Sequence, residues 1–115
     1  MIREFRRARR RNVPKPVTVF DLMTEQAIGR LGNVSESGML LVATAPVQED
    51  ALYQLRFHLR DDRGQDIPID VGAHLLWSAQ ANTPGQSFAG LRFLTIDREP
   101  LELLRRWVNA GPEAE

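Results

Sequence analysis

Apolar and polar side chains alternate without a break over residues 53–60, YQLRFHLR. Four positions are apolar and four are polar: Tyr53, Leu55, Phe57 and Leu59 against Gln54, Arg56, His58 and Arg60. A period of two is typical of a β-strand that packs one face on a core and exposes the other to water. Because a single strand cannot bury such a face alone, this segment commits the chain to a sheet. With 115 residues, the chain has room for one domain around one core.

The segment that follows predicts a hairpin. Residues 61–66, DDRGQD, are turn formers, and we expect Gly64 to adopt a positive φ. The chain then alternates again over a longer stretch, with apolar side chains at Ile67, Ile69, Val71, Ala73, Leu75 and Trp77. The two alternating segments therefore form neighbouring antiparallel strands, and Trp77 continues the apolar face of the second one.

Four further segments have the β-branched and aromatic composition of strands. They are residues 17–23, 27–35, 39–44 and 88–96, and nearly all their connections are too short for parallel crossovers. A helix follows, with Asp97 suited to its N-cap, Pro100 to its first turn and Gly111 to its end. Its apolar stripe is Leu101, Leu104, Trp107 and Val108. These elements predict a mainly β fold of about six antiparallel strands, closed into a barrel or a sandwich, with the C-terminal helix packed on it.

Several classes of function find no support in the residues. The chain has no cysteine, and neither His58 nor His74 has a partner at metal-ligand spacing, so we expect no metal site. No serine stands in a recognisable nucleophile setting and the carboxylates are scattered over loops, so we expect no catalytic residues and no enzyme activity. No apolar stretch approaches the ~20 residues of a membrane span, and none follows the N-terminal arginines as in a secretory signal. We therefore expect no membrane insertion and a cytoplasmic location.

The basic charge of the chain is concentrated at its N-terminus. Residues 1–15 carry seven basic side chains against one acidic, whereas residues 16–115 carry eight basic against fourteen acidic. Residues 1–12 have no usable apolar face, and Pro14 and Pro16 prevent a helix from continuing. We therefore predict a flexible arginine-rich arm over residues 1–12, a β domain with its helix over 13–111 and a tail over 112–115. The arm should be mobile unless a partner holds it, and its charge should attract anions.

A polar strand end, GNVSESG at residues 32–38, leads into the apolar segment 39–44. On an extended strand Asn33 and Ser35 point to one face, and we expect Gly38 to adopt a positive φ and to leave room for a ligand. The amide, the hydroxyl and exposed backbone N–H groups suit a nucleotide edge or a phosphate. Arginines four residues apart in the arm can grip such a ligand from two sides. A simple hairpin turn explains the same Asn, Ser and Gly without any ligand.

The spacing RxxxR in the arm, NxSxxG at 33–38, GLRF at 90–93 and the terminal helix together resemble the PilZ domain family, the bacterial receptor module for cyclic di-GMP. The resemblance implies a six-stranded antiparallel β-barrel whose arginine arm closes over cyclic di-GMP, often an intercalated dimer of it. The ligand residues that it implies are Arg6, Arg7, Arg10, Arg11, Asn33, Ser35, Gly38 and Trp77. The arginine register stays open, because RRARR matches a motif that begins at Arg6 with two adjacent arginines, while the distance to Asn33 favours Arg7 and Arg11.

The resemblance implies a non-catalytic receptor without a cofactor, whose arm becomes ordered over the ligand and presents a new surface to a protein effector. Two other interpretations remain open: an interaction module of the same fold that does not bind the nucleotide, and an arm that binds nucleic acid non-specifically. The acidic body and the small aromatic surface argue against nucleic acid. Trp77 also suits a core position, because it continues an apolar face, and Arg92 also suits an exposed barrel position.

Overall fold

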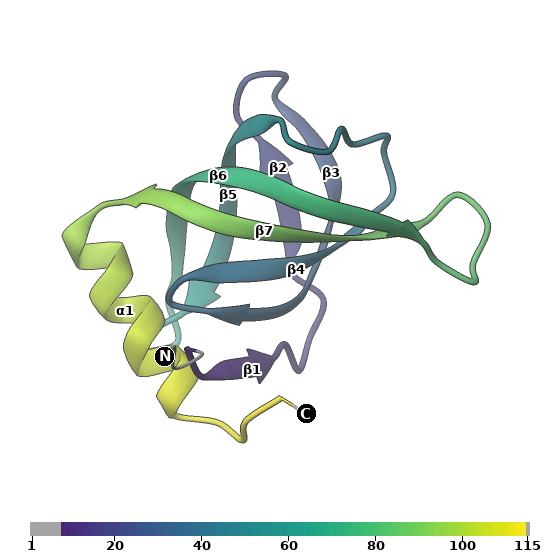
Figure 1. Cartoon of the computed structure of the whole chain (residues 1–115). Coiled ribbons are helices and arrows are strands. Elements are labelled where there is room, and N and C mark those ends of the chain that lie inside the picture. The colour runs from purple at the N-terminus through teal and green to yellow at the C-terminus, as the bar shows by residue number, and fades with distance from the viewer. Residues whose placement is uncertain (1–7, 115) are drawn as a thin grey trace, which may run out of the picture.

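Strands make up most of the described chain, which covers residues 8–114 of the computed structural model (Figure 1). In chain order the elements are β1 (Arg10–Asn12), β2 (Thr18–Asp21), β3 (Gln26–Ser35), β4 (Gly38–Ala43), β5 (Leu52–Arg60), β6 (Asp66–Gln80), β7 (Ser87–Ile96) and α1 (Arg98–Asn109). Six strands pair in the order β3-β2-β5-β6-β7-β4, and the ring closes because β4 also pairs with β3. All these pairings are antiparallel. The predicted six-stranded antiparallel barrel with a C-terminal helix is therefore confirmed.

The apolar side chains of the two alternating segments, β5 and β6, fill the interior of the barrel. The side chains at the inward positions are at most 2% exposed: Leu55, Phe57, Leu59, Ile69, Val71, Ala73 and Leu75. Across the core the rings of Phe57 and Phe93 stack, with 6.5 Å between their centroids. The two strands pair without a break from Leu52 opposite His74 to Arg60 opposite Asp66, which confirms the predicted hairpin.

The alternation in β6 ends before Trp77, contrary to the expectation from the sequence. The pairing of β6 with β7 shifts between Leu75 and Trp77, so Leu76 is an extra residue in the strand. Because an extra residue reverses which side chains face outward, Leu75 is fully buried whereas Trp77 is 46% exposed. Trp77 is therefore a surface residue, and periodicity alone could not reveal this bulge.

Helix α1 lies beside the barrel, against β1, β3 and β6 (Figure 1). Asp97 is the N-cap residue as predicted, although its side chain makes no capping hydrogen bond. The buried side chains of the helix are Leu103, Leu104 and Val108, so the packed face includes Leu103, which the predicted stripe omitted. Within residues 8–114, no helix is long and apolar enough to span a bilayer.

Strand β1 falls inside residues 1–12, which the sequence assigned to a flexible arm. Strand β2 covers only the first half of the long strand β3, up to Arg30, and β1 pairs with the other end of the same edge. Two backbone hydrogen bonds continue this edge between the two short strands, from Val13 N to Gly32 O (3.3 Å) and from Leu31 N to Val17 O (2.8 Å). The open edge of β3 thus needs backbone partners, and the end of the predicted arm supplies them.

Candidate functional site

One row of paired residues crosses five strands on the outer face of the barrel. We call it the outer row, and it consists of Asn12 (β1), Asn33 (β3), Leu40 (β4), Gly90 (β7) and Trp77 (β6). Paired residues of antiparallel strands point to the same face, and the neighbouring row of Val34, Met39, Leu91 and Leu75 is buried. Figure 1 shows these strands following one another across the face turned to the viewer. The outer row is therefore a continuous strip of barrel surface.

Trp77 ends the outer row on β6 and lies against the backbone of Gly90. A Cβ atom at Gly90 would collide with Nε1 and Cε2 of the indole, so only glycine admits the ring in this position. Because nearly half of the Trp77 surface remains exposed, the side chain offers an aromatic platform on which a planar group can stack. Trp77 is thus available at the surface.

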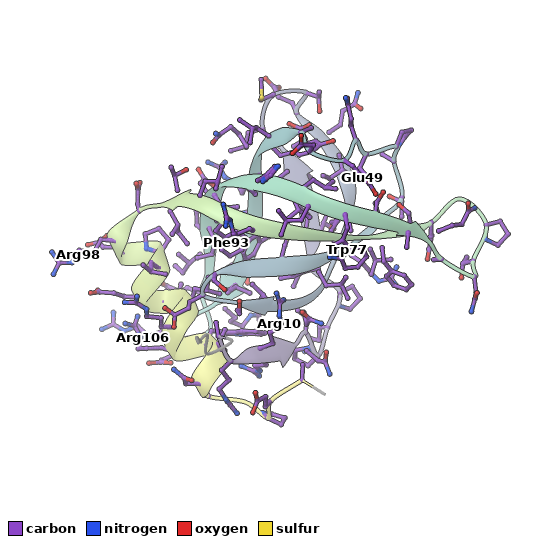
Figure 2. The ribbon with its side chains drawn as sticks, in the orientation of Figure 1. Arg10, Glu49, Trp77, Phe93, Arg98 and Arg106 are labelled. Atoms are coloured by element: carbon purple, nitrogen blue, oxygen red, sulfur yellow. The ribbon has the colours of Figure 1, made fainter. Side chains whose placement is uncertain are left out.

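Arg10 and Asn33 lie at the other end of this surface. Arg10 Nη1 donates a hydrogen bond to Asn33 Oδ1 at 2.8 Å, and in Figure 2 Arg10 extends from β1 over the end of β3. The pairing of β3 with β4 shifts between Leu31 and Asn33, which turns Asn33 outward while Val34 is fully buried. The structure therefore brings one arginine of the predicted arm to the predicted strand motif.

Of the other three arginines of the predicted set, only Arg11 lies within the described residues. Arg6 and Arg7 lie outside the described residues. Arg11 lies on the opposite face of β1 from Arg10, because neighbouring residues of a strand alternate. Its guanidinium carbon is 3.9 Å from the ring centroid of Trp107, and its Nη1 donates to Trp107 O at 2.7 Å. The structure thus brings Arg10, but not Arg11, to the outer row.

Ser35 and Gly38 build the β3–β4 turn. Ser35 is fully buried, and its Oγ accepts hydrogen bonds from the backbone N–H groups of Ser37 (3.1 Å) and Gly38 (3.2 Å). Gly38 does not have the positive φ that its sequence context predicted. A Cβ there would collide with Leu91 O of β7, so close packing of two strands requires this glycine. The hairpin explanation of these two residues is therefore well supported by their contacts.

Arg92 is a cationic side chain of this surface for which the sequence suggested only an exposed barrel position. It pairs with Gly38 of β4 on one side and with His74 of β6 on the other. The Arg92 side chain is exposed and makes no hydrogen bond or ion pair with any other residue among 8–114. His74 is held by Asp50, with 2.6 Å between Nε2 and Oδ1. Arg92 is part of the GLRF sequence, but only the strand register places it beside the β3–β4 turn.

A groove of about 810 Å³ lies elsewhere on the barrel. It is lined by Val13, Pro14, Lys15, Pro16, Val17, Thr18, Phe20, His58, Leu59, Arg60, Asp66 and Trp107. None of the candidate ligand residues lines this groove. In the same described range no three histidine or carboxylate side chains are grouped to hold a metal ion. The candidate ligand residues therefore lie on a different surface from this groove.

Three solved structures have a similar fold. They are the Bacillus subtilis inhibitor of motility MotI/DgrA (TM-score 0.78, 15% identity, covering 93% of this chain and 50% of that one), Escherichia coli YcgR in complex with c-di-GMP (0.69, 23%, 91% and 45%), and the PilZ domain of Escherichia coli YcgR with c-di-GMP (0.62, 17%, 93% and 91%). The chain thus spans about half the length of the first two proteins.

The sequence of this chain indicates its family more directly than the fold does. No curated protein is similar enough to this chain to count as a match. The sequence model of the PilZ domain, in contrast, matches residues 3–110. This match covers nearly the whole chain, including the arm and the NxSxxG strand. The chain therefore belongs to the PilZ domain family.

Proposed function

We propose that this chain is a non-catalytic receptor for cyclic di-GMP, which binds on the outer row between Arg10 and Trp77. Membership of the PilZ family and the fold shared with two YcgR structures in complex with c-di-GMP support this ligand. The observation that carries the proposal is the hydrogen bond between Arg10 and Asn33. It joins Arg10 of the RxxxR arm to Asn33 of the NxSxxG motif, 23 residues further along the chain, in a partly buried place on the outer face.

Arg10 and Asn33 have the chemistry that a guanine nucleotide requires. A guanidinium group binds a phosphate, or O6 and N7 of guanine, through two parallel hydrogen bonds. The Asn33 amide accepts from Arg10 through Oδ1, while its N–H donors have no partner among residues 8–114. The pair can therefore present donors to phosphate oxygens or to a base edge without leaving a buried polar group unsatisfied.

Trp77 and Arg92 complete the proposed surface. The exposed ring of Trp77 can stack on a guanine base, an interaction worth about 1–3 kcal/mol per base in single-stranded nucleic acid complexes. Arg92 supplies a second guanidinium on the side of the turn opposite to Arg10. Cationic groups on two sides of the turn suit a ligand with two phosphates.

The arm provides the switch in this proposal. Arg6 and Arg7 add charge next to Arg10, and we assign them to the ligand as well. Ordering a chain segment costs about 1–2 kcal/mol per residue, which an anionic ligand offsets only when it is bound. Binding therefore changes the surface around β1, and a protein effector reads that change.

Isothermal titration calorimetry with cyclic di-GMP tests the proposal. We expect saturable binding to the wild-type protein and at least ~10-fold weaker binding after Arg10→Ala, the usual effect of losing a charged hydrogen bond. Arg63→Ala is the matched control, since it removes one arginine from the exposed β5–β6 turn. No binding at high micromolar nucleotide would favour an interaction module of the same fold, and equal affinity of the Arg10 and Arg63 variants would refute the proposed site.

A further inference from the structure

The two faces of strand β1 contact different parts of the molecule. Arg10 reaches Asn33 on the outer face, whereas Arg9 and Arg11 turn toward the end of helix α1. Arg9 Nη2 donates to Gly111 O at 2.8 Å, and Arg11 Nη1 donates to Trp107 O at 2.7 Å. Trp107 lies in the last turn of α1, where the backbone carbonyls carry partial negative charge, and Gly111 follows the C-cap residue Ala110. The two arginines therefore anchor β1 to the helix C-terminus.

Arg11 makes a second contact with the same helix. Its guanidinium carbon lies 3.9 Å from the ring centroid of Trp107. Gly111 has no room for a Cβ because the Arg11 side chain occupies that space. Arg11 is thus held by a ring, a carbonyl oxygen and a glycine that admits it, all at the helix end. This arrangement leaves its guanidinium directed away from the outer row.

The C-terminal segment completes the attachment of β1. Ala114 N donates to Arg10 O at 2.8 Å, and Arg11 forms an antiparallel bridge with Glu113. Strand β1 therefore has β3 on one edge and the C-terminal segment on the other. A strand of only three residues makes few ladder bonds of its own, so these contacts contribute much of what keeps it in place.

We propose that Arg11, assisted by Arg9, is a positioning residue for the nucleotide: by holding β1 on helix α1 it keeps Arg10 in register with Asn33. The inference rests on the proposed function of the outer row. A side chain that is already in place binds more tightly than one that must be ordered by the ligand, because the ordering cost is removed from the binding step. Loss of the anchor therefore weakens nucleotide binding without removing a ligand contact.

The same linkage operates in the reverse direction. If the Arg11 anchor favours nucleotide binding, then nucleotide binding must favour the Arg11 anchor by the same factor. The signal of binding thus reaches Trp107 and the end of α1 from the opposite face of β1. Trp77 lies on the outer row and Trp107 at the anchor, and the sequence has no other tryptophan. The two indole N–H groups therefore report on the two faces separately.

The test combines affinity with the two indole N–H signals in NMR spectra of the full chain, titrated with cyclic di-GMP. In the wild-type protein we expect both signals to shift. Arg11→Ala should lower the affinity about tenfold, a typical coupling factor, and the Trp77 signal should still shift at saturation while the Trp107 signal no longer follows the ligand. Arg11→Lys, which keeps the charge near the carbonyl, should recover part of the affinity. Arg106→Ala removes an arginine from the last turn of α1 itself, and it is the control for the loss of positive charge near the end of the helix.

Trp107→Leu distinguishes positioning from direct contact. It removes the ring under Arg11 and leaves Arg11 itself, so an anchoring role predicts weaker binding that is not additive with Arg11→Ala. Urea unfolding verifies that each variant is folded at the titration temperature, and Arg9→Ala serves as the milder variant. Unchanged affinity of the folded Arg11 and Trp107 variants in the presence of wild-type binding would overturn the positioning role and leave the proposed function intact. Absence of wild-type binding would instead overturn the proposed function itself.

Discussion

The β3–β4 and β5–β6 hairpins reverse the chain with the same local chemistry in different surroundings. In the β3–β4 turn, Ser35 Oγ accepts the backbone N–H groups of Ser37 and Gly38. In the β5–β6 turn, Asp61 Oδ1 accepts the backbone N–H groups of Arg63 and Gln65, both at 2.9 Å. Both turns therefore use a side-chain oxygen to satisfy backbone donors that no strand can pair.

The glycines of the two turns serve different purposes. Gly64 has a φ of +78°, and a Cβ atom added there would have no neighbour within 4 Å, so only the backbone conformation requires glycine, as the sequence predicted. Gly38 has no such φ, and its neighbour Leu91 O leaves no space for a side chain. The β5–β6 turn is thus an exposed reversal of the chain. The β3–β4 turn is packed on β7 beside β1, which gives the residues around it fixed positions.

The largest difference between the hairpins should appear with Gly38→Ala. The added methyl group collides with the backbone of β7, which cannot move without shifting the barrel, so we expect a loss of about 3 kcal/mol in the free energy of unfolding. Urea unfolding followed by circular dichroism measures this value. A loss no greater than that caused by the same substitution at Gly64 would contradict the packed character of the turn.

Removing the turn acceptors should separate the hairpins next. Ser35→Ala leaves the buried backbone N–H of Gly38 without its acceptor, at a cost of about 2 kcal/mol. Asp61→Ala leaves its two donors near the surface, where water replaces the carboxylate, and should cost about 0.5 kcal/mol. Both values come from urea titrations at one pH. Equal costs would show that burial does not distinguish the two acceptors.

Gly64→Ala isolates the conformational part of the comparison. The new side chain meets no atom, but its φ lies in the left-handed region, so we expect a loss of about 1 kcal/mol. Gly64→Asn should lose less than Gly64→Ala, since asparagine tolerates this region better. Thermal unfolding of the two variants side by side provides the measurement. The reverse ranking would mean that something other than φ selects glycine here.

The smallest effect should come from the exposed ion pair on the β5–β6 hairpin. Arg56 donates to both carboxylate oxygens of Asp70, at 2.6 and 2.8 Å, and these hydrogen bonds lower the pKa of Asp70 below its usual range. A lowered carboxyl pKa in the folded state contributes stability above the unfolded pKa of about 4. That stability is lost as the pH falls through the folded pKa. The difference in urea midpoint between wild type and Asp70→Asn should therefore be small at pH 7 and smaller still at pH 3.

The barrel could be predicted because apolar and polar side chains alternate along its strands. Phe57 and Ile69 lie in the core where a period of two puts them. Two features escaped prediction for one physical reason, namely that the pairing between strands is not encoded in the local periodicity of the sequence. The extra residue Leu76 turns Trp77 outward, and the open edge of β3 orders Arg10–Asn12 at the end of the predicted arm.

The candidate site was predicted in composition more than in arrangement. The motif spacing drew attention to Arg10 and Asn33, which are in contact. The same spacing could not tell Arg10 from Arg11, because only the pairing of β1 fixes which arginine faces outward. Arg92 was not among the predicted ligand residues, because its place beside Gly38 depends on the register of β4 with β7. Assignment of these residues to the ligand stays a prediction.

A titration of the labelled protein with cyclic di-GMP, followed by NMR, tests the central claim most directly. The two hairpins carry their own reporters in the backbone N–H signals of Gly38 and Gly64, and the outer row adds Gly90 and the Trp77 indole. We predict that the Gly38, Gly90 and Trp77 signals shift to saturation while the Gly64 signal stays in place. Shifts at Gly64 without shifts along the outer row, or no shift anywhere at high micromolar nucleotide, would contradict nucleotide binding on the outer row.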